Sequence, residues 1–145
     1  MTLGRPPTFI RFPPRSVHAS AFSALPTPVR LMDTRNSPTV DGQFTNQGTL
    51  PAGTVTQLTV GGRAGIPADA ATSVLNVTVV GAEAPGFITV YPCGQSRPLA
   101  SNLNYVAGDV IPNAVISGIG TAGKVCVYNS APTGLIVDAS GTLAS

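Results

Sequence analysis

The chain has 145 residues, enough for one domain with a core of its own, and its net charge is only +2. Charged residues make up 10% of the chain, well below the roughly 25% of an average globular domain. This composition argues against the basic surface of a nucleic-acid-binding protein. The apolar runs also fall short of the roughly 20 residues that a membrane helix needs.

Residues 1–28 differ from the rest of the chain in composition. They hold six of the fourteen prolines and three arginines but no acidic residue. Paired prolines favour extended backbone and exclude helix, so the segment is predicted to be an extended arm, with a disordered tail as the alternative. Proline or arginine interrupts each of its apolar runs, which argues against a secretory signal peptide. We expect the arm to bind a partner protein through its basic and large apolar residues, Arg5, Phe9, Ile10, Arg11, Phe12, Arg15 and Phe22.

From Val29 onward, short runs of β-forming residues alternate with turn-forming residues. The runs are VRLMDTR (29–35), TVTQLTV (54–60), SVLNVTVV (73–80), FITVYP (87–92), SNLNYV (101–106), VIPNAVISGI (110–119), KVCVYN (124–129) and LIVDAS (135–140). Strands at this spacing are typical of a sandwich or barrel, and no window has a convincing helical period. We predict an all-β domain over residues 29–145, a β-sandwich of jelly-roll or Ig-like type with about eight short antiparallel strands.

The alternation within the runs predicts which side chains face the core. In SVLNVTVV, Leu75, Val77 and Val79 share one face, because successive side chains of a strand point to opposite sides. In SNLNYV, Leu103 and Tyr105 share the inward face, and the asparagines between them point outward.

Two runs indicate their place in a sheet. KVCVYN is apolar on both faces, with Val125 and Val127 on one side and Cys126 and Tyr128 on the other. This pattern predicts a central strand covered on both faces. Pro112 interrupts the run 110–119, and proline lacks the N–H that a sheet ladder needs. We therefore expect an edge strand or a bulge there.

Cys93 and Cys126 are the only cysteines, and each lies in or just after a predicted strand. A bridge between neighbouring strands would stabilise the domain and indicate an oxidising destination. Two buried free thiols are the alternative. A zinc site would need more ligands than the cysteines and His18, the sole histidine, supply, so no metal is expected.

No set of residues indicates catalysis. His18 lies in the arm, far along the chain from the cysteines, and the carboxylates stand mostly in predicted turns, where Asp caps backbone donors. Asp138 follows an apolar run, and we expect it to form a structural ion pair with Arg35 or with Arg30. The glycine clusters lack the spacing of a nucleotide-binding loop. We predict a protein that is not an enzyme and needs no cofactor.

The strand surfaces are the remaining candidate for a function. The stretch YPCGQSRPLASNLNYVAG (91–108) holds a thiol, an arginine and asparagines but no histidine or carboxylate, so we interpret it as scaffold rather than active site. Uncharged polar side chains on outward strand faces suit a sugar or a flat protein partner, and a merely solvated face is the alternative. These side chains are Gln57, Asn76, Thr78, Asn102 and Asn104. Tyr91, Tyr105 and Tyr128 could stack on a sugar ring if they are exposed.

Four segments of the chain form a recognisable set. They are RLMDTR (30–35), SVLNVTVVGAEAPGFITVYPCG (73–94), RPLASNLNYVAGDVIPNAVI (97–116) and GKVCVYNSAPTGLIVDASG (123–141). Together they resemble a β-rich domain of actinobacterial extracellular and wall-associated proteins, and related modules occur in virion proteins of phages that infect these bacteria. The resemblance covers residues 29–141 and carries no catalytic residue. It favours the disulfide because secreted members often keep cysteines that match Cys93 and Cys126.

The resemblance, together with the arm, implies a non-enzymatic phage virion protein, a capsid decoration or tail accessory protein on the virion surface. The arm would hold a capsid or tail protein, and the sandwich would face outward. Analogy with other decoration proteins implies a homo-oligomer such as a trimer, with a host-surface glycan as a candidate partner and neither nucleic acid nor membrane expected. The alternative is a secreted actinobacterial module that binds the cell wall or a carbohydrate.

Overall fold

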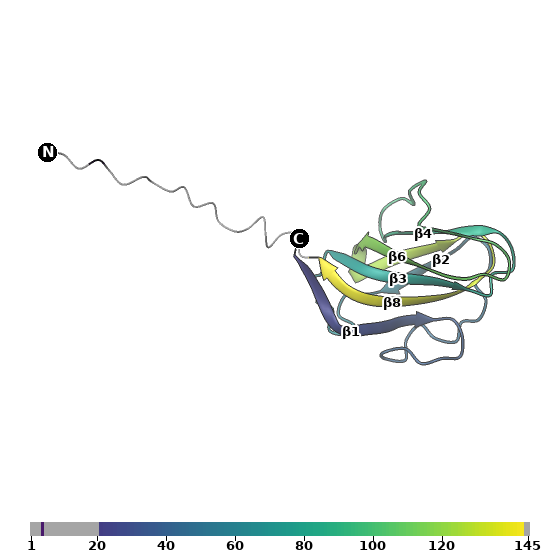
Figure 1. Ribbon diagram of the computed structural model, residues 1–145, viewed down its shortest axis with the longest axis horizontal. Helices are drawn as coiled ribbons and strands as arrows, with labels where there is room; N and C mark the ends of the chain where they lie inside the picture. Colours follow the sequence, from purple (N-terminus) through teal and green to yellow (C-terminus); the bar gives the residue numbers. More distant parts are fainter. Residues whose placement is uncertain (1–3, 5–20, 144–145) are drawn as a thin grey trace.

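The computed structural model of the protein describes Gly4 and residues 21–143. Over these residues the chain forms two four-stranded antiparallel sheets, which confirms the predicted all-β sandwich (Figure 1). One sheet has the order β1-β8-β3-β6 and the other the order β2-β7-β4-β5. The strands are β1 (Phe22–Asp33), β2 (Thr54–Thr59), β3 (Thr72–Val80), β4 (Gly86–Pro92), β5 (Leu103–Tyr105), β6 (Val110–Gly118), β7 (Lys124–Asn129) and β8 (Gly134–Leu143).

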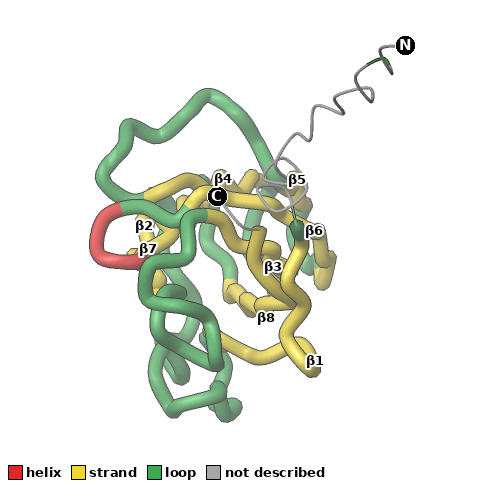
Figure 2. Tube along the Cα trace, turned by 90° about the vertical axis from the view of Figure 1, so that its left-hand side faces the viewer, coloured by secondary structure: helices red, strands yellow, loops and turns green. Residues whose placement is uncertain are grey.

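The strand pairing is that of a jelly roll. β1 pairs with β8, β2 with β7, β3 with β6 and β4 with β5, as in one long hairpin whose tip lies between β4 and β5. Two further pairings, β3 with β8 and β4 with β7, complete each sheet when this hairpin rolls up. An Ig-like sandwich has a different strand order, so the structure selects the jelly roll from the two predicted types. The short 3₁₀ turn η1 (Thr121–Gly123) lies just before β7 (Figure 2).

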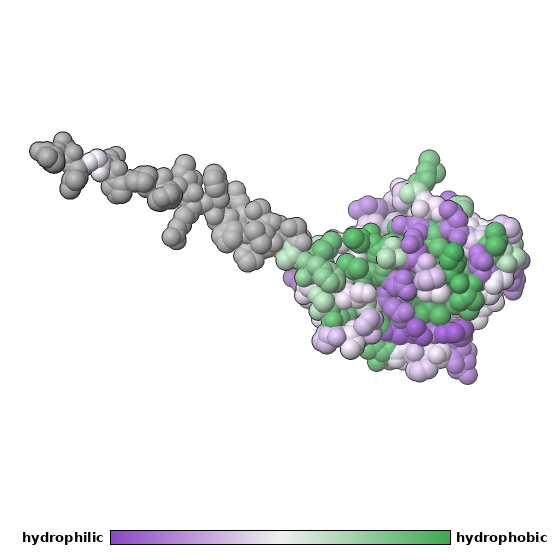
Figure 3. Space-filling model, in the orientation of Figure 1, coloured by the Kyte–Doolittle hydropathy of each residue, from purple (hydrophilic) through white to green (hydrophobic). Residues whose placement is uncertain are grey.

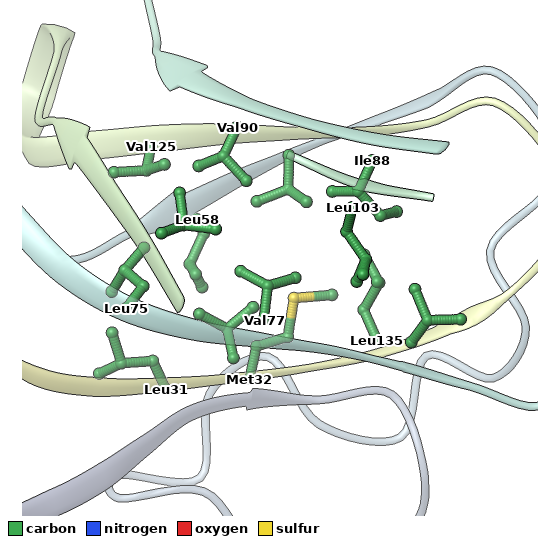
Figure 4. Packing of buried hydrophobic residues seen from close by; sticks show 14 of the residues in the cluster. Leu31, Met32, Leu58, Leu75, Val77, Ile88, Val90, Leu103, Val125 and Leu135 are labelled. Atoms are coloured by element: carbon green, nitrogen blue, oxygen red, sulfur yellow. The ribbon is translucent and has the colours of Figure 1, made fainter. Parts of the chain in front are cut away.

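The core lies between the two sheets and follows the predicted alternation (Figure 4). Leu75, Val77 and Val79 of β3 are buried, and so are Leu103 and Tyr105 of β5. Apolar residues at every second position let one face of a strand pack inward while the other stays outside. The largest fully buried side chains come from both layers and are Leu31, Met32, Leu58, Val60, Leu75, Val77, Val79, Ile88, Val125, Val127, Leu135 and Val137.

Strands β7 and β6 lie where the sequence predicts. β7 is a central strand, with Val125 and Val127 in the core and Cys126 buried on the opposite face. β6 is an edge strand, in which Pro112 stands opposite Thr78 of β3. An edge strand tolerates proline because one of its sides needs no ladder partner.

The folded domain begins earlier than predicted. β1 begins at Phe22, so residues 22–28, which the sequence assigns to the arm, belong to the sheet. Phe22 pairs with Leu143 of β8, and the register then shifts across the part of β1 that contains Pro26 and Pro28. The prolines are accommodated because β1 is an edge strand and because a register shift leaves backbone groups unpaired.

The ion pair predicted between Arg35 and Asp138 is not formed. Asp138 pairs with Arg30, the other candidate, at 2.9 Å between Nε and Oδ1. Arg30 and Asp138 stand opposite each other in the β1–β8 register, whereas Arg35 lies past the end of β1. Arg35 bonds to Asp33 instead, at 2.9 Å between Nη2 and Oδ2. The register decides the pairing because directly opposed residues lie closest across a sheet.

The segment between β1 and β2 is fastened to the domain by Arg63, which is buried. The Arg63 guanidinium donates to both Asp41 carboxylate oxygens, at 2.8 and 2.7 Å, and to the carbonyl oxygens of Thr59 and Leu31, each at 2.9 Å. Its Cζ lies 5.1 Å from the centre of the Phe44 ring. The hydrogen bonds from Arg63 lower the pKa of Asp41 to about 2.

Candidate functional site

Cys93 and Cys126 form a disulfide, with their Cα atoms 5.0 Å apart. Cys126 lies on the outer face of β7, and Cys93 directly follows β4, the strand that pairs with β7. With Tyr91 and half-buried Tyr128, the cysteines form a small apolar cluster apart from the main core. The bridge confirms the predicted disulfide and ties the start of the β4–β5 loop to a central strand.

The β4–β5 loop, residues 93–102, shapes a pocket of about 230 Å³ on the outer face of the sheet β2-β7-β4-β5. Phe87 of β4 stands opposite Asn104 of β5, and both alternate with core residues, so their side chains point outward. The loop supplies the other walls. The lining residues are Phe87, Arg97, Pro98, Leu99, Ala100, Ser101 and Asn104.

Three hydrogen bonds fasten the second half of the loop to β4. The backbone N–H of Asn102 donates to the Ile88 carbonyl at 2.8 Å, and the N–H of Val90 donates to Oδ1 of Asn102 at 2.7 Å. The hydroxyl of Thr89 donates to the Ala100 carbonyl at 2.7 Å. The pocket wall is therefore fixed by hydrogen bonds on one side and by the disulfide on the other.

Arg97 forms the charged end of the pocket, and the Tyr128 ring lies behind it. The Arg97 Cζ lies 3.6 Å from the centre of the Tyr128 ring, a separation typical of a guanidinium stacked on an aromatic face. The rings of Phe87 and Tyr128 are 5.8 Å apart and tilted by 51°. Among the described residues, the ion pairs belong to Arg30, Arg35 and Arg63, so Arg97 has no acidic partner there.

A second donor lies beside Arg97. The Ser101 hydroxyl donates to Oδ1 of Asn104 at 2.8 Å. This bond fixes the Asn104 amide and leaves its Nδ2 without a hydrogen-bond partner in the part of the chain that the structure describes. The pocket thus offers N–H donors, and no carboxylate lines it.

The three tyrosines that the sequence suggests for sugar stacking lie in three different environments. Tyr91 is buried in the disulfide cluster. Tyr105 is buried in the main core, where its hydroxyl donates to the Ala131 carbonyl and accepts from the Ala131 N–H. Tyr128 is half-buried and lies under Arg97. None of them offers an open ring face, and Phe87 is the exposed aromatic residue of the pocket.

The other polar residues suggested for binding divide between the two sheets. Asn76 and Thr78 are half-buried on β3, and Gln57 is exposed on β2. Asn102 is occupied in the loop, so Asn104 alone of this set lines the pocket. The face shown in Figure 3 intersperses hydrophilic and hydrophobic residues.

The stretch 91–108, interpreted from sequence as scaffold, serves as scaffold and as pocket wall. Its cysteine and buried tyrosines support the sheet, while Arg97 and Leu99 reach the pocket. Sequence reasoning missed Phe87 and Leu99. The alternation in FITVYP is the signal that could have found Phe87, because inward Ile88 and Val90 leave Phe87 facing outward.

Asp33, Asp41 and Asp138 are held in ion pairs with arginines. Asp33 and Asp138 converge on Arg30, and the hydrogen bond from Arg35 lowers the pKa of Asp33. A proton-transfer group works best with a pKa near the operating pH, so a lowered pKa does not favour acid–base work. Among the residues that the structure describes, no three His, Cys, Asp or Glu side chains gather to hold a metal ion.

Most residues predicted for the arm lie outside the described part of the chain: Arg5, Phe9, Ile10, Arg11, Phe12 and Arg15. Phe22 is described and lies in β1 with 54% of its surface exposed. A Cβ added at Gly141 of β8 would stand 2.7 Å from the Phe22 ring, so the ring lies against the backbone of β8. Phe22 is therefore a residue of the sheet edge.

Within the described residues, no helix has the length and apolar character needed to cross a bilayer. Comparisons with protein-family models, with curated proteins and with solved structures found no match for this chain.

Proposed function

We propose that this chain is a non-enzymatic structural protein of a phage virion, a capsid decoration or tail accessory protein that presents its jelly roll outward. The observation that carries the proposal is the strand order, because jelly rolls build viral capsid domains. The Cys93–Cys126 disulfide suits a particle that works outside the reducing cytosol.

Attachment is assigned to the segment ahead of β1. Residues 1–21 hold three arginines, several large apolar residues and no acid. Arginine and aromatic residues are enriched at protein interfaces, so this composition suits an acidic and partly apolar surface of a capsid or tail protein. The segment leads into β1, an edge strand, so its partner can be held without disturbing the core.

A binding role also fits the chemistry of the folded domain. Asp33, Asp41 and Asp138 are engaged by arginines, and the pocket holds donors but no acid–base pair. A homo-oligomer belongs to the same proposal, because surface proteins of symmetric particles are commonly oligomeric. Light scattering of the purified chain tests it, and a monomer would contradict this part.

The experiment is one of location. A tagged full-length chain and a variant lacking residues 1–20 are expressed in an actinobacterial host during phage infection, and particles are purified on a density gradient. The full chain should sediment with the particles, and the shortened chain should be absent from them although its thermal unfolding stays cooperative. Replacing Arg5, Arg11 and Arg15 by Ser should weaken incorporation at unchanged length. A full chain found on the host wall and not on particles would favour the secreted module instead.

A further inference from the structure

We infer that the pocket beside Arg97 binds a carboxylate-bearing pyranose, a sugar residue of the uronic-acid type, through the Arg97 guanidinium and the Asn104 amide. The inference goes beyond the virion proposal and does not depend on it. It rests on the pocket alone, so it applies wherever the protein is displayed.

The charge of the pocket calls for an anionic ligand. Arg30, Arg35 and Arg63 each have a carboxylate partner, whereas Arg97 has none among the described residues. No carboxylate lines the pocket to compete for Arg97. Stacking on Tyr128 occupies the face of the guanidinium and leaves its N–H edge free, and this planar edge matches the two oxygens of a carboxylate.

The remaining surface of the pocket suits a sugar ring. The Asn104 Nδ2 can donate to a ring hydroxyl, which accepts hydrogen bonds as readily as it donates them. Phe87, Pro98 and Leu99 supply apolar walls for the C–H face of a pyranose. The volume of about 230 Å³ lies below the roughly 300–1,000 Å³ of sites for drug-sized ligands, so it suits a single ring.

Both ends of the loop and the two polar groups of the site are held in place without a ligand. The disulfide holds one end of the loop, and the hydrogen bonds of Thr89 and Asn102 hold the other. Ser101 orients Asn104, and Tyr128 orients Arg97. Binding to groups that are already placed costs little conformational entropy, which is what a small ligand with few contacts requires.

The position of the pocket favours a saccharide over a peptide. An extended peptide binds β-proteins by adding a strand to a free sheet edge, where backbone groups are unpaired. This pocket lies on the outer face of the sheet, where the side chains of Phe87 and Asn104 point, and not along the free side of β5, which is the edge strand of its sheet. A ligand there meets the outward side chains of Phe87, Arg97 and Asn104, and these suit a pyranose better than an extended backbone.

The test is a titration of the full-length, isotope-labelled protein followed by NMR. Methyl glucuronide and methyl glucoside differ only at C6, which is a carboxylate in the first and a hydroxymethyl group in the second. Sodium acetate supplies a carboxylate without a ring. Methyl glucuronide should shift the signals of Phe87, Arg97 and Asn104, with an affinity roughly tenfold above that of the glucoside. Equal affinity for the two sugars, or an acetate affinity equal to that of the glucuronide, would overturn the inference.

Two matched variants show whether Arg97 carries the preference. Arg97→Gln should remove the preference for glucuronide over glucoside while the disulfide and the thermal unfolding midpoint stay unchanged. Lys124→Gln removes one positive charge away from the pocket lining and should keep the preference. If both variants lose the preference for glucuronide, the preference depends on the net charge of the protein and not on a site at Arg97, and the inference is contradicted.

Discussion

Arg30 and Asp138 face each other across β1 and β8, with Nε 2.9 Å from Oδ1, and the same guanidinium reaches Oδ2 of Asp33 at 3.3 Å. The two carboxylates differ in exposure. The Asp33 side chain is fully buried, whereas 20% of the Asp138 side chain is exposed. Asp33 also accepts hydrogen bonds from the backbone N–H and the guanidinium of Arg35. Arg30 therefore bonds to two carboxylates in different surroundings: Asp33, whose charge is buried, and Asp138, whose charge water can still reach.

Replacing these carboxylates should have unequal effects on stability. Asp33→Asn should lower the free energy of unfolding by roughly 2 kcal/mol, because it weakens the charge-assisted hydrogen bonds that the buried carboxylate accepts from Arg30 and Arg35. Asp138→Asn should cost about 1 kcal/mol or less, because part-exposed pairs are screened by water. Urea unfolding at low salt measures both, and equal costs would show that burial does not decide the contribution.

The pair of Asp41 and Arg63 should make stability depend on acid pH. The pKa of Asp41 is lowered from its usual value to about 2. A carboxylate whose pKa is lower in the folded protein contributes its stability above the unfolded pKa, near 4, and loses it as the pH falls toward 2. When the pH falls from about 4 to 2, the free energy of unfolding should decrease by about 1 kcal/mol less in Asp41→Asn than in the wild type. The difference is small because the pair is part-exposed. An unchanged acid profile would mean that the pair contributes nothing.

Alternation of side chains made the core predictable. Residues such as Leu75, Val77 and Val79 have the period of a strand, and that period alone assigns them to one face. Alternation gives no information on which strand pairs with which. The jelly-roll order, and with it the choice of Arg30 over Arg35 as the partner of Asp138, depends on register between segments far apart in the chain.

The pocket was less predictable than the core because it depends on a loop. Asn104 stands opposite Phe87 through the β4–β5 register, but Arg97 reaches the same pocket only because the loop folds back over the outer face of β4. Nothing in the sequence QSRPLA fixes that path. The path of the loop is set by the disulfide at one end and by the hydrogen bond from the Val90 N–H to the Asn102 side chain at the other.

The disulfide should be a large part of the domain's stability. Removing it in the double variant Cys93→Ala with Cys126→Ala should lower the free energy of unfolding by about 3–4 kcal/mol, since the bridge closes a loop of 33 residues in the unfolded chain. Urea unfolding with and without reductant measures the effect. The wild-type protein should respond to reductant and the double variant should not, and a wild type that is indifferent to reductant would contradict the prediction.

The Tyr105 hydroxyl should stabilise the turn between β7 and β8. It donates to the Ala131 carbonyl at 2.8 Å and accepts from the Ala131 N–H at 3.2 Å, all within the buried interior. Tyr105→Phe should cost roughly 2 kcal/mol, because it leaves the buried Ala131 N–H without a partner, while the Ala131 carbonyl still accepts from Asn129 Nδ2 at 3.1 Å. Tyr128→Phe is the control, because no described residue bonds to its hydroxyl, and should change stability by less than about 0.5 kcal/mol. If the two variants lose similar amounts of stability, the Tyr105 hydroxyl does not stabilise the turn.

The N-terminal half of β1 offers a direct test of where the domain begins. Phe22 lies against Gly141, and residues 22–24 pair with residues 141–143 of β8. Sequence composition places the boundary after residue 28, because Pro26 and Pro28 look like the end of the arm. The structure places these prolines inside an edge strand.

A chain that begins at Ala21 should therefore unfold at nearly the same urea concentration as the full protein, because it keeps every described pairing of β1 with β8. A chain that begins at Val29 should be less stable, because it loses the Phe22 contact and exposes part of the β8 edge. An uncovered strand edge also promotes association between chains, so light scattering should show aggregation of the shorter chain only. If both chains match the full protein in stability and solubility, the first half of β1 adds nothing to the fold and the boundary predicted from composition is restored.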